Sequence, residues 1–236
     1  MNMSMYACSD LHGMKELYLK IKDFLKPEDK VFFLGDAGDR GPQPWELIKL
    51  IFEDEQFIYI KGNHEQLLEN AITEYEIEGV PGTYFYLLTG NGGKETFRGW
   101  MHESEEVQIG YYKALKNLPD YMIYENKNDV KVILTHAGFT PMTSKIEIPD
   151  THTCMWDRTH IDDKWIENLA ENVVIVHGHT PIPHLERCNI EDFVPKAYWY
   201  CDNHKVDLDN AAFATGATVL LDLDTFEEHV FKIETV

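Results

Sequence analysis

The chain has 236 residues and a formal net charge of −20, from 41 acidic and 21 basic residues. This charge disfavours binding to nucleic acid or to an anionic membrane surface, because both reward basic patches. No apolar run approaches the roughly 18 residues of a membrane helix, and the 4 cysteines lack CxxC spacing, so we expect reduced thiols and neither disulfides nor a zinc site.

The chain is expected to form one domain over residues 1–236. No Pro-, Gly- or Ser-rich linker and no internal repeat interrupts the sequence. The first eight residues lack the basic region of a signal peptide, so we expect a cytoplasmic protein. The oligomeric state is left open.

The first predicted strand, residues 5–8, ends in Ser-Asp-Leu-His-Gly. Asp10 and His12 are two residues apart, so in an extended chain their side chains would point the same way. A carboxylate and an imidazole so placed can share one metal ion, although Asp and Gly are also ordinary turn residues. Apolar residues at helical spacing then predict a helix over residues 14–26, which Pro27 ends.

The second predicted strand, residues 31–34, leads into the central motif Gly-Asp-Ala-Gly-Asp-Arg-Gly. The motif presents the carboxylates of Asp36 and Asp39 and the guanidinium of Arg40. Packing at the end of a buried strand requires none of these charges, whereas a site for metal ions and phosphate uses all three. A helix is predicted after it, over residues 42–52.

The third predicted strand, residues 57–60, ends in Lys-Gly-Asn-His-Glu, which contains Asn63 and His64. Three successive strands thus end in metal- or phosphate-binding residue types, and in open α/β sheets ligands bind at the carboxyl ends of strands. A helix is predicted over residues 65–78. The Gly- and aromatic-rich residues 79–104 are expected to form a loop, and their glycine run does not match a P-loop.

The second half of the chain repeats this design with histidines. After a predicted helix over residues 105–118, predicted strands over residues 130–134 and 173–176 end in motifs that contain His136 and His179. His177, two residues before the latter, is given a structural role. A last strand pair is expected near residues 211–214 and 219–223. The pattern predicts two sheets packed together with helices outside.

The five motifs together resemble the calcineurin-like metallophosphoesterases, and within them the PPP-type serine/threonine phosphatases of the small bacterial and phage type. The motifs are Asp-x-His, Gly-Asp-x-x-Asp-Arg-Gly, Gly-Asn-His-Glu, His-Ala-Gly and Gly-His-Thr. Asn-Gly-Gly at 91–93, Leu-Pro at 118–119, Trp-Asp-Arg at 156–158 and Thr-Gly-Ala at 215–217 extend the match over nearly the whole chain. The resemblance implies a four-layer α/β/β/α sandwich with two metal ions between the sheet edges.

The resemblance also implies which residues hold the metals. Two bind the first ion, one bridges, and three complete the second; in that order they are Asp10 and His12, Asp36, and Asn63, His136 and His179. Oxygen and imidazole ligands without thiolate suit Mn, Fe or Zn, and manganese is expected from the resemblance.

The implied reaction is hydrolysis of a phosphate monoester by in-line attack of a hydroxide that bridges the metals, without a covalent phosphoenzyme. Arg40 and Arg158 would clamp the phosphoryl oxygens, next to Asn63. His64 would protonate the leaving group and be kept cationic by Asp39. The expected substrate is a phosphoprotein or a small phosphate ester.

Two alternatives remain open. Symmetric dinucleoside-tetraphosphate hydrolases of the same superfamily tend to lack the Asp of Asp-Arg-Gly and to carry Gly-Asn-His-Asp, so Asp39 and Glu65 favour the phosphatase. A metal-free binding scaffold is disfavoured because every ligand position is filled. Substrate choice is expected to depend on residues 79–104 and 139–160.

Overall fold

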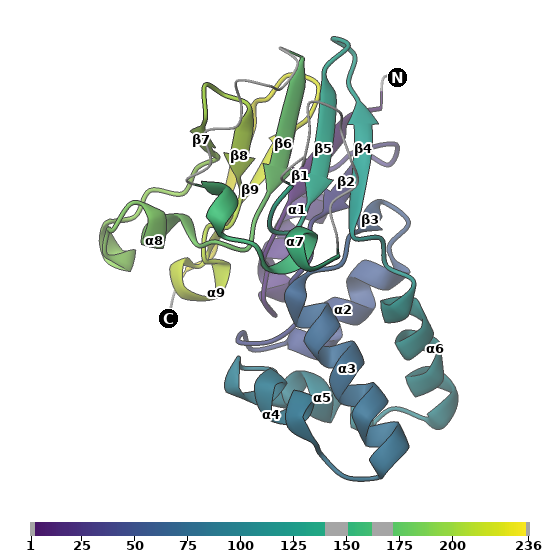
Figure 1. The fold of residues 1–236 in the computed structure, drawn as a ribbon. Coiled ribbons are helices and arrows are strands. Elements are labelled where there is room, and N and C mark those ends of the chain that lie inside the picture. The colour runs from purple at the N-terminus through teal and green to yellow at the C-terminus, as the bar shows by residue number, and fades with distance from the viewer. Residues whose placement is uncertain (1–2, 140–150, 162–171, 235–236) are drawn as a thin grey trace.

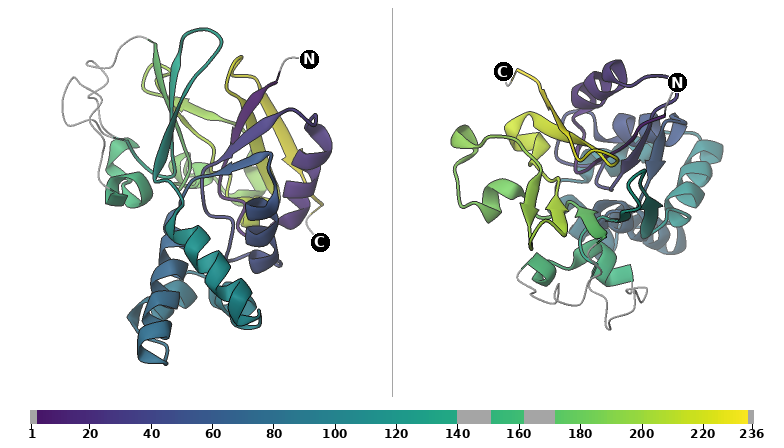
Figure 2. Two further views of the ribbon diagram at one scale, coloured as in Figure 1. Left: turned by 90° about the vertical axis from the view of Figure 1, so that its right-hand side faces the viewer. Right: turned by 90° about the horizontal axis from the view of Figure 1, so that it is seen from above.

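A computed structural model describes residues 3–139, 151–161 and 172–234. Two mixed five-stranded sheets face each other with helices outside them (Figures 1 and 2), which confirms the expected sandwich. The first sheet has the order β10-β9-β1-β2-β3, with strands Glu228–Lys232, Ala217–Asp222, Met5–Cys8, Lys30–Phe33 and Phe57–Tyr59. The second has the order β4-β5-β6-β8-β7, with strands Tyr121–Glu125, Lys131–Thr135, Val173–His177, Lys205–Asp207 and Tyr198–Tyr200.

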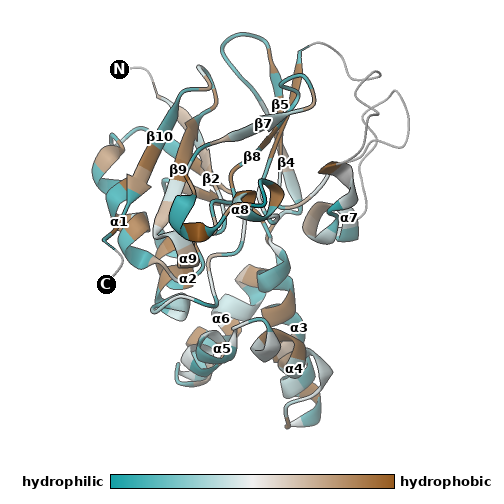
Figure 3. Ribbon diagram, turned by 90° about the vertical axis from the view of Figure 1, so that its left-hand side faces the viewer, coloured by the Kyte–Doolittle hydropathy of each residue, from teal (hydrophilic) through white to brown (hydrophobic). Residues whose placement is uncertain are grey.

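Alternation along the strands builds the layers. In β1, Met5 and Ala7 face the core between the two sheets, whereas Tyr6 and Cys8 face the helices. β5 repeats the pattern: Val132 and Leu134 enter the core between the sheets, and the residue between them packs on the far side. Because side chains alternate across a strand, both sheets are apolar on two faces. Figure 3 shows hydrophobic colour along the strands and hydrophilic colour in the connecting loops.

The helices lie on the outside and beyond one end of the sheets (Figure 1). Their bounds are α1 Lys15–Phe24, α2 Pro44–Glu53, α3 Asn63–Glu78, α4 Thr83–Gly90, α5 Lys94–Met101, α6 Glu105–Lys116, α7 Thr151–Trp156, α8 Ile182–Leu185 and α9 Ala212–Thr215. Within the described ranges, none of the helices has the length and apolar character that crossing a membrane requires.

The expected loop at residues 79–104 is wrong, because most of it forms α4 and α5. Its glycines separate helices: Gly79 ends α3 in the left-handed conformation with φ 70°. Two of its aromatic residues, Phe97 and Trp100, are buried and packed against Tyr75 of α3, whereas Tyr84 and Tyr86 are exposed. Of the second region expected to govern substrate choice, residues 140–150 lie outside the described residues.

The end of the chain also differs from the prediction. The expected strand at residues 211–214 is the short helix α9, because Ala211 turns the chain with φ 52°. The strands β4, β7, β8 and β10 were not predicted. β7 and β8 have three residues each, and β4 and β10 lie at sheet edges, where half-exposed side chains give no clear alternation of apolar and polar residues.

Candidate metal and phosphate site

The predicted site residues meet at one end of the two sheets. All but Arg158, which follows α7, come directly after β1, β2 and β3 of the first sheet or β5 and β6 of the second, where these strands end. A cleft of about 280 Å³ opens there, lined by Asp10, Asp36, Arg40, Asn63, His64, Asn91, Trp156, Arg158, His179 and Pro181. His12, Asp39 and His136 are buried beside it. All of the residues singled out from the sequence are therefore brought together.

A first group of candidate ligands contains Asp10, His12 and one oxygen of Asp36. His12 Nε2 lies 3.6 Å from Asp36 Oδ2 and 3.9 Å from Asp10 Oδ1. His12 Nδ1–H donates to the Gly38 carbonyl at 2.9 Å, which leaves the Nε2 lone pair for a metal ion. The extended backbone expected for this pair is wrong: Asp10 and His12 have φ 53° and 41°. They converge through left-handed turns and not through strand alternation.

A second group of candidate ligands surrounds the other oxygen of Asp36. His136 Nδ1–H donates to the Leu34 carbonyl at 2.7 Å, and burial lowers the pKa of His136 to about 3, so its Nε2 carries a lone pair. That Nε2 faces Asp36 Oδ1 at 3.5 Å and Asn63 Oδ1 at 2.9 Å, and His179 Nδ1 lies 3.0 Å from the same amide oxygen. A cation would satisfy these facing acceptors, so the residues fit a metal ion.

The proposed acid, His64, is held by a buried carboxylate. Its Nδ1–H donates to Asp39 Oδ2, and its Nε2 accepts from Arg40 at 2.9 Å. Asp39 in turn accepts from the Thr96 hydroxyl, and its backbone N–H donates to Thr96 Oγ1 at 3.0 Å. The Thr96 anchor comes from α5, inside the stretch that was expected to be a loop.

From the sequence, Glu65 served only as a marker that distinguishes two subfamilies. In the structure this residue anchors the central motif. Its carboxylate accepts the backbone N–H groups of Asp36 at 2.7 Å, Ala37 at 3.0 Å and Gly62 at 2.9 Å, and the Tyr59 hydroxyl at 2.7 Å. The ends of β2 and β3 are thereby joined. A Cβ on Gly62 would lie 2.2 Å from Asp36 Oδ1, so glycine is required for this approach.

Replacing Glu65 with glutamine is expected to lower the free energy of unfolding by about 1–3 kcal/mol, because the new NH₂ group faces buried N–H donors. Urea unfolding of the metal-free protein measures this. Glu69→Gln is the matched control on the same helix: its partner Lys61 lies 2.9 Å away and Glu69 is 17% exposed, so a smaller loss is expected. Equal losses in both variants would contradict the anchoring role.

Burial sets the ionisation of the groups around the cleft. Burial, and then the charge of Asp209, raises the pKa of Asp10. Asp209 itself is fully buried and its pKa rises to about 6, again chiefly through burial. The sequence prediction missed Asp209 because its surroundings were taken for a strand pair. The Asp-Leu-Asp spacing at 207–209 was the available signal for a further buried acid.

These shifts predict that a divalent metal stabilises the fold more in mildly alkaline than in acidic solution. The folded pKa of Asp209, about 6, lies above its ordinary 3.8, so its contribution to stability is present below 3.8 and lost as pH rises towards 6. Because its pKa is lowered to about 3, His136 is already neutral at high pH and has no proton to lose from Nε2 before a cation binds. We expect Mn²⁺ to raise Tm more at about pH 7.5 than at about pH 5, where protons compete for the ligands.

Thermal unfolding with chelator and with Mn²⁺ at the two pH values measures this difference. Asp36→Asn should reduce the Mn²⁺-dependent shift at both values, because it removes a proposed ligand. A Tm shift as large at the lower pH would contradict the assignment of buried carboxylates and neutral histidines as ligands.

Six site residues adopt the left-handed backbone region. Positive φ angles between 41° and 70° occur at Asp10, His12, Asp36, Asp39, Arg40 and His179. Such conformations are uncommon outside glycine and concentrate at functional sites. The turns that follow the strands are therefore held in place by the surrounding contacts and not by local preference.

Arg158 and His177 take different positions. Arg158 lines the cleft and donates to the His179 carbonyl at 3.4 Å, so both predicted arginines border the same space. His177 is fully buried, donates from Nδ1 to the Gly178 carbonyl at 3.0 Å and accepts from the Tyr200 hydroxyl at 2.6 Å. These partners support its structural role.

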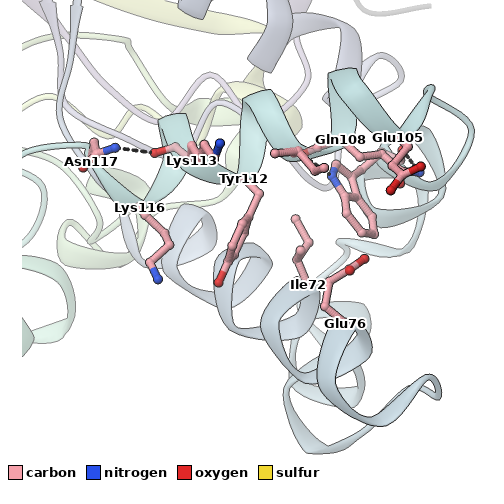
Figure 4. Close-up of a pocket in the computed structure, with 10 residues that line it drawn as sticks. Ile72, Glu76, Glu105, Gln108, Tyr112, Lys113, Lys116 and Asn117 are labelled. Carbon is pink, nitrogen blue, oxygen red and sulfur yellow. Dashed lines mark hydrogen bonds between the residues drawn. The ribbon is translucent and has the colours of Figure 1, made fainter.

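A hollow of about 570 Å³ lies away from this cleft, between α3, α5 and α6 (Figure 4). Glu76, Glu105, Lys113 and Lys116 are among the residues that line it, and none of the predicted site residues does. Among the described residues that line it there is no histidine or arginine, so it lacks the imidazole and guanidinium groups that gather at the cleft.

Comparison with known proteins gives the context of the site. A family model described as calcineurin-like phosphoesterase matches residues 3–213. The asymmetrical bis(5′-nucleosyl)-tetraphosphatase PrpE of Anoxybacillus flavithermus is 23% identical over 170 residues, which are 65% of this chain and 64% of that protein. The serine/threonine-protein phosphatase PP1-delta of Caenorhabditis elegans is 39% identical over 66 residues, 25% of this chain and 22% of that protein. The matches thus span less than two thirds of either relative.

A solved structure shares the fold. A protein serine/threonine phosphatase from Saccharomyces cerevisiae, with similarity to human phosphatase PP5, superposes with a TM-score of 0.59 at 14% identity, over 99% of this chain and 81% of that one. At this identity the likeness concerns the fold alone.

Proposed function

The chain belongs to the calcineurin-like phosphoesterase family of divalent-metal-dependent hydrolases, and from this premise we propose that it hydrolyses phosphate esters in the cleft between its sheets. The observation that carries the proposal is the position of Asp36. Its Oδ2 faces His12 Nε2 at 3.6 Å and its Oδ1 faces His136 Nε2 at 3.5 Å, so this one carboxylate would join the two proposed ligand groups.

Two divalent cations, manganese first and iron or zinc next, would be held by the six proposed ligands Asp10, His12, Asp36, Asn63, His136 and His179. When bound, such a pair lowers the pKa of a water molecule and binds the phosphoryl oxygens. This supplies positive charge that a chain of net charge −20 otherwise lacks.

The remaining residues have roles in binding and proton transfer. Arg40 and Arg158 border the cleft and are proposed to orient the phosphoryl oxygens. Arg40 Nη1 now lies 2.7 Å from His12 Nε2, so it would release that lone pair when a cation binds. His64 Nε2 accepts from Arg40 in the structure. Once Arg40 turns to the phosphoryl oxygens, this nitrogen is proposed to carry a proton and to donate it to the leaving oxygen, with Asp39 stabilising the imidazolium.

Two substrate classes are proposed. The Asp39–His64 pair together with Glu65 favours a phosphoserine or phosphothreonine protein, for which the leaving alkoxide needs a proton. The sequence similarity to an asymmetrical bis(5′-nucleosyl)-tetraphosphatase favours a dinucleoside polyphosphate.

The test compares the two substrates directly. Protein stripped with a chelator is assayed with and without Mn²⁺ on a phosphothreonine peptide and on diadenosine tetraphosphate. Turnover that depends on Mn²⁺ is expected, and the faster substrate identifies the class. Bound Mn²⁺ without turnover of any phosphate ester would contradict the proposed function, and a protein that takes up no Mn²⁺ would favour the scaffold alternative.

A further inference from the structure

A second cavity adjoins the proposed phosphate cleft. It encloses about 460 Å³ between α8, α9 and the 3₁₀ turn Ile190–Asp192, elements that lie together beside the second sheet (Figure 1). Arg158 and Pro181 line both this cavity and the cleft. A group bonded to a phosphate in the cleft would therefore lie next to this cavity.

The lining of this cavity differs from the rest of the protein surface in charge. Among the described residues that line it there is no aspartate or glutamate, although the chain has 41 of them. Its ionisable lining is Arg158, His184 and the thiol of Cys188, and prolines, alanines and Ile190 supply most of the remainder. Such walls suit an uncharged, flat group attached to anionic phosphates, and give no partner to the basic side chains of a peptide.

One polar atom in the wall has no partner. The Thr180 side chain is 5% exposed, and among the described residues its Oγ1 is one of few buried side-chain atoms without a hydrogen bond. Buried hydroxyls are normally satisfied, so a ligand atom is the fitting partner. Since Thr180 lines the cavity, rotation of its side chain would bring this hydroxyl to one polar edge of the bound group.

An exposed aromatic side chain, that of Phe213, borders the cavity and lies near Arg40 of the cleft. Phe213 of α9 is 43% exposed, although its ring lies 5.1 Å from the Arg40 guanidinium carbon and 5.8 Å from the His12 ring. An aromatic ring left open at the border of two pockets offers its surface for stacking, as aromatic side chains do with nucleobases. Phe213 also lines the cavity.

We infer that this cavity is a nucleobase subsite: it takes the base of a nucleoside whose phosphate lies in the cleft, with stacking on Phe213 and a hydrogen bond to Thr180. The inference rests on the proposed function for the position of the phosphate. It favours nucleoside phosphates over phosphoproteins as substrates.

The test compares binding of two hydrolysis-resistant ligands to the Mn²⁺-loaded protein by calorimetry. They are the 5′-methylenephosphonates of adenosine and of ribose, which differ in the base alone. We expect the adenosine compound to bind about tenfold or more tightly, the scale of one stacked base. Phe213→Leu should abolish most of this ratio and Thr180→Val should reduce it.

The ratio of the two affinities corrects for indirect effects of Phe213→Leu on Arg40, because such effects would weaken the binding of both ligands alike. Phe24→Leu is the matched control, a phenylalanine 41% exposed that packs against the unrelated Tyr6 and His229, and it should keep the wild-type ratio. Equal affinities in the wild type, no binding of either ligand, or a ratio that survives Phe213→Leu would overturn the inference. The inference would also be overturned if Phe213→Leu weakened the binding of a phosphothreonine peptide but not the binding of the adenosine compound. These are binding results, so they are distinct from failure of hydrolysis.

Discussion

Asp36→Asn is expected to lower kcat/KM for any phosphate ester by about a thousandfold or more, the upper range for removing one charge-stabilising group from a preorganised site. The substitution keeps the shape of the side chain and an oxygen for the His64 backbone N–H, which Asp36 Oδ1 accepts at 3.0 Å. It removes the negative charge and one of the two oxygens that face the separate ligand groups. Activity and bound metal should therefore fall together.

The measurement pairs steady-state kinetics with metal content by mass spectrometry. Asp29→Asn is the control, because Asp29 is equally buried but accepts backbone N–H groups of Ser4 and Lys26, away from the cleft. It should lose stability while it keeps activity and metal. An Asp36→Asn protein with normal metal content and more than a tenth of the activity would exclude the bridging role.

His64→Asn is expected to slow hydrolysis of an alkyl phosphate by about 10²–10⁴-fold, the usual contribution of a positioned general acid. An aryl phosphate should be affected far less, because its leaving group departs without a proton. The comparison of the two esters is needed because His64 could instead bind a metal ion. Its Nε2 lies 3.8 Å from Asp36 Oδ2, and together with His12 and Asp36 it forms a group that could hold a cation.

Rates on the two substrates distinguish these roles. Loss on the alkyl ester alone supports proton donation, whereas equal loss on both, with reduced metal content, would identify His64 as a metal ligand. His102→Asn is the control. His102 is exposed at the end of α5, and its Nδ1 forms a hydrogen bond with the Arg98 carbonyl of the same helix at 2.7 Å. It should leave both rates unchanged.

The sequence predicted the strands that carry the site better than the helices that support it. β1, β2, β3, β5 and β6 are short buried apolar runs, and each ends in a motif of polar residues that packing cannot explain. Aromatic residues in 79–104 misled the prediction because a buried helix and a Gly-rich loop share that composition. Only the contacts of Phe97 and Trp100 with α3 distinguish them.

Supporting residues were harder to predict than reacting ones. Thr96 and Asp209 act on partners 57 and about 200 positions away in the chain, through hydrogen bonding and charge. A single sequence holds no trace of such pairing. Glu65 could be recognised as part of a motif. That it accepts hydrogen bonds from three backbone N–H groups depends on how β2 and β3 lie side by side.

The left-handed turns have a consequence for how this protein can change. Conformations of this kind cost of order 1–3 kcal/mol each, and the positive φ angles recur at six site residues, a load comparable with the whole net stability of a domain, about 5–15 kcal/mol. Selection for heat tolerance and selection for turnover therefore oppose each other at the same few positions. Thermostable forms should be sought in the helices remote from the cleft, where substitutions leave these turns intact.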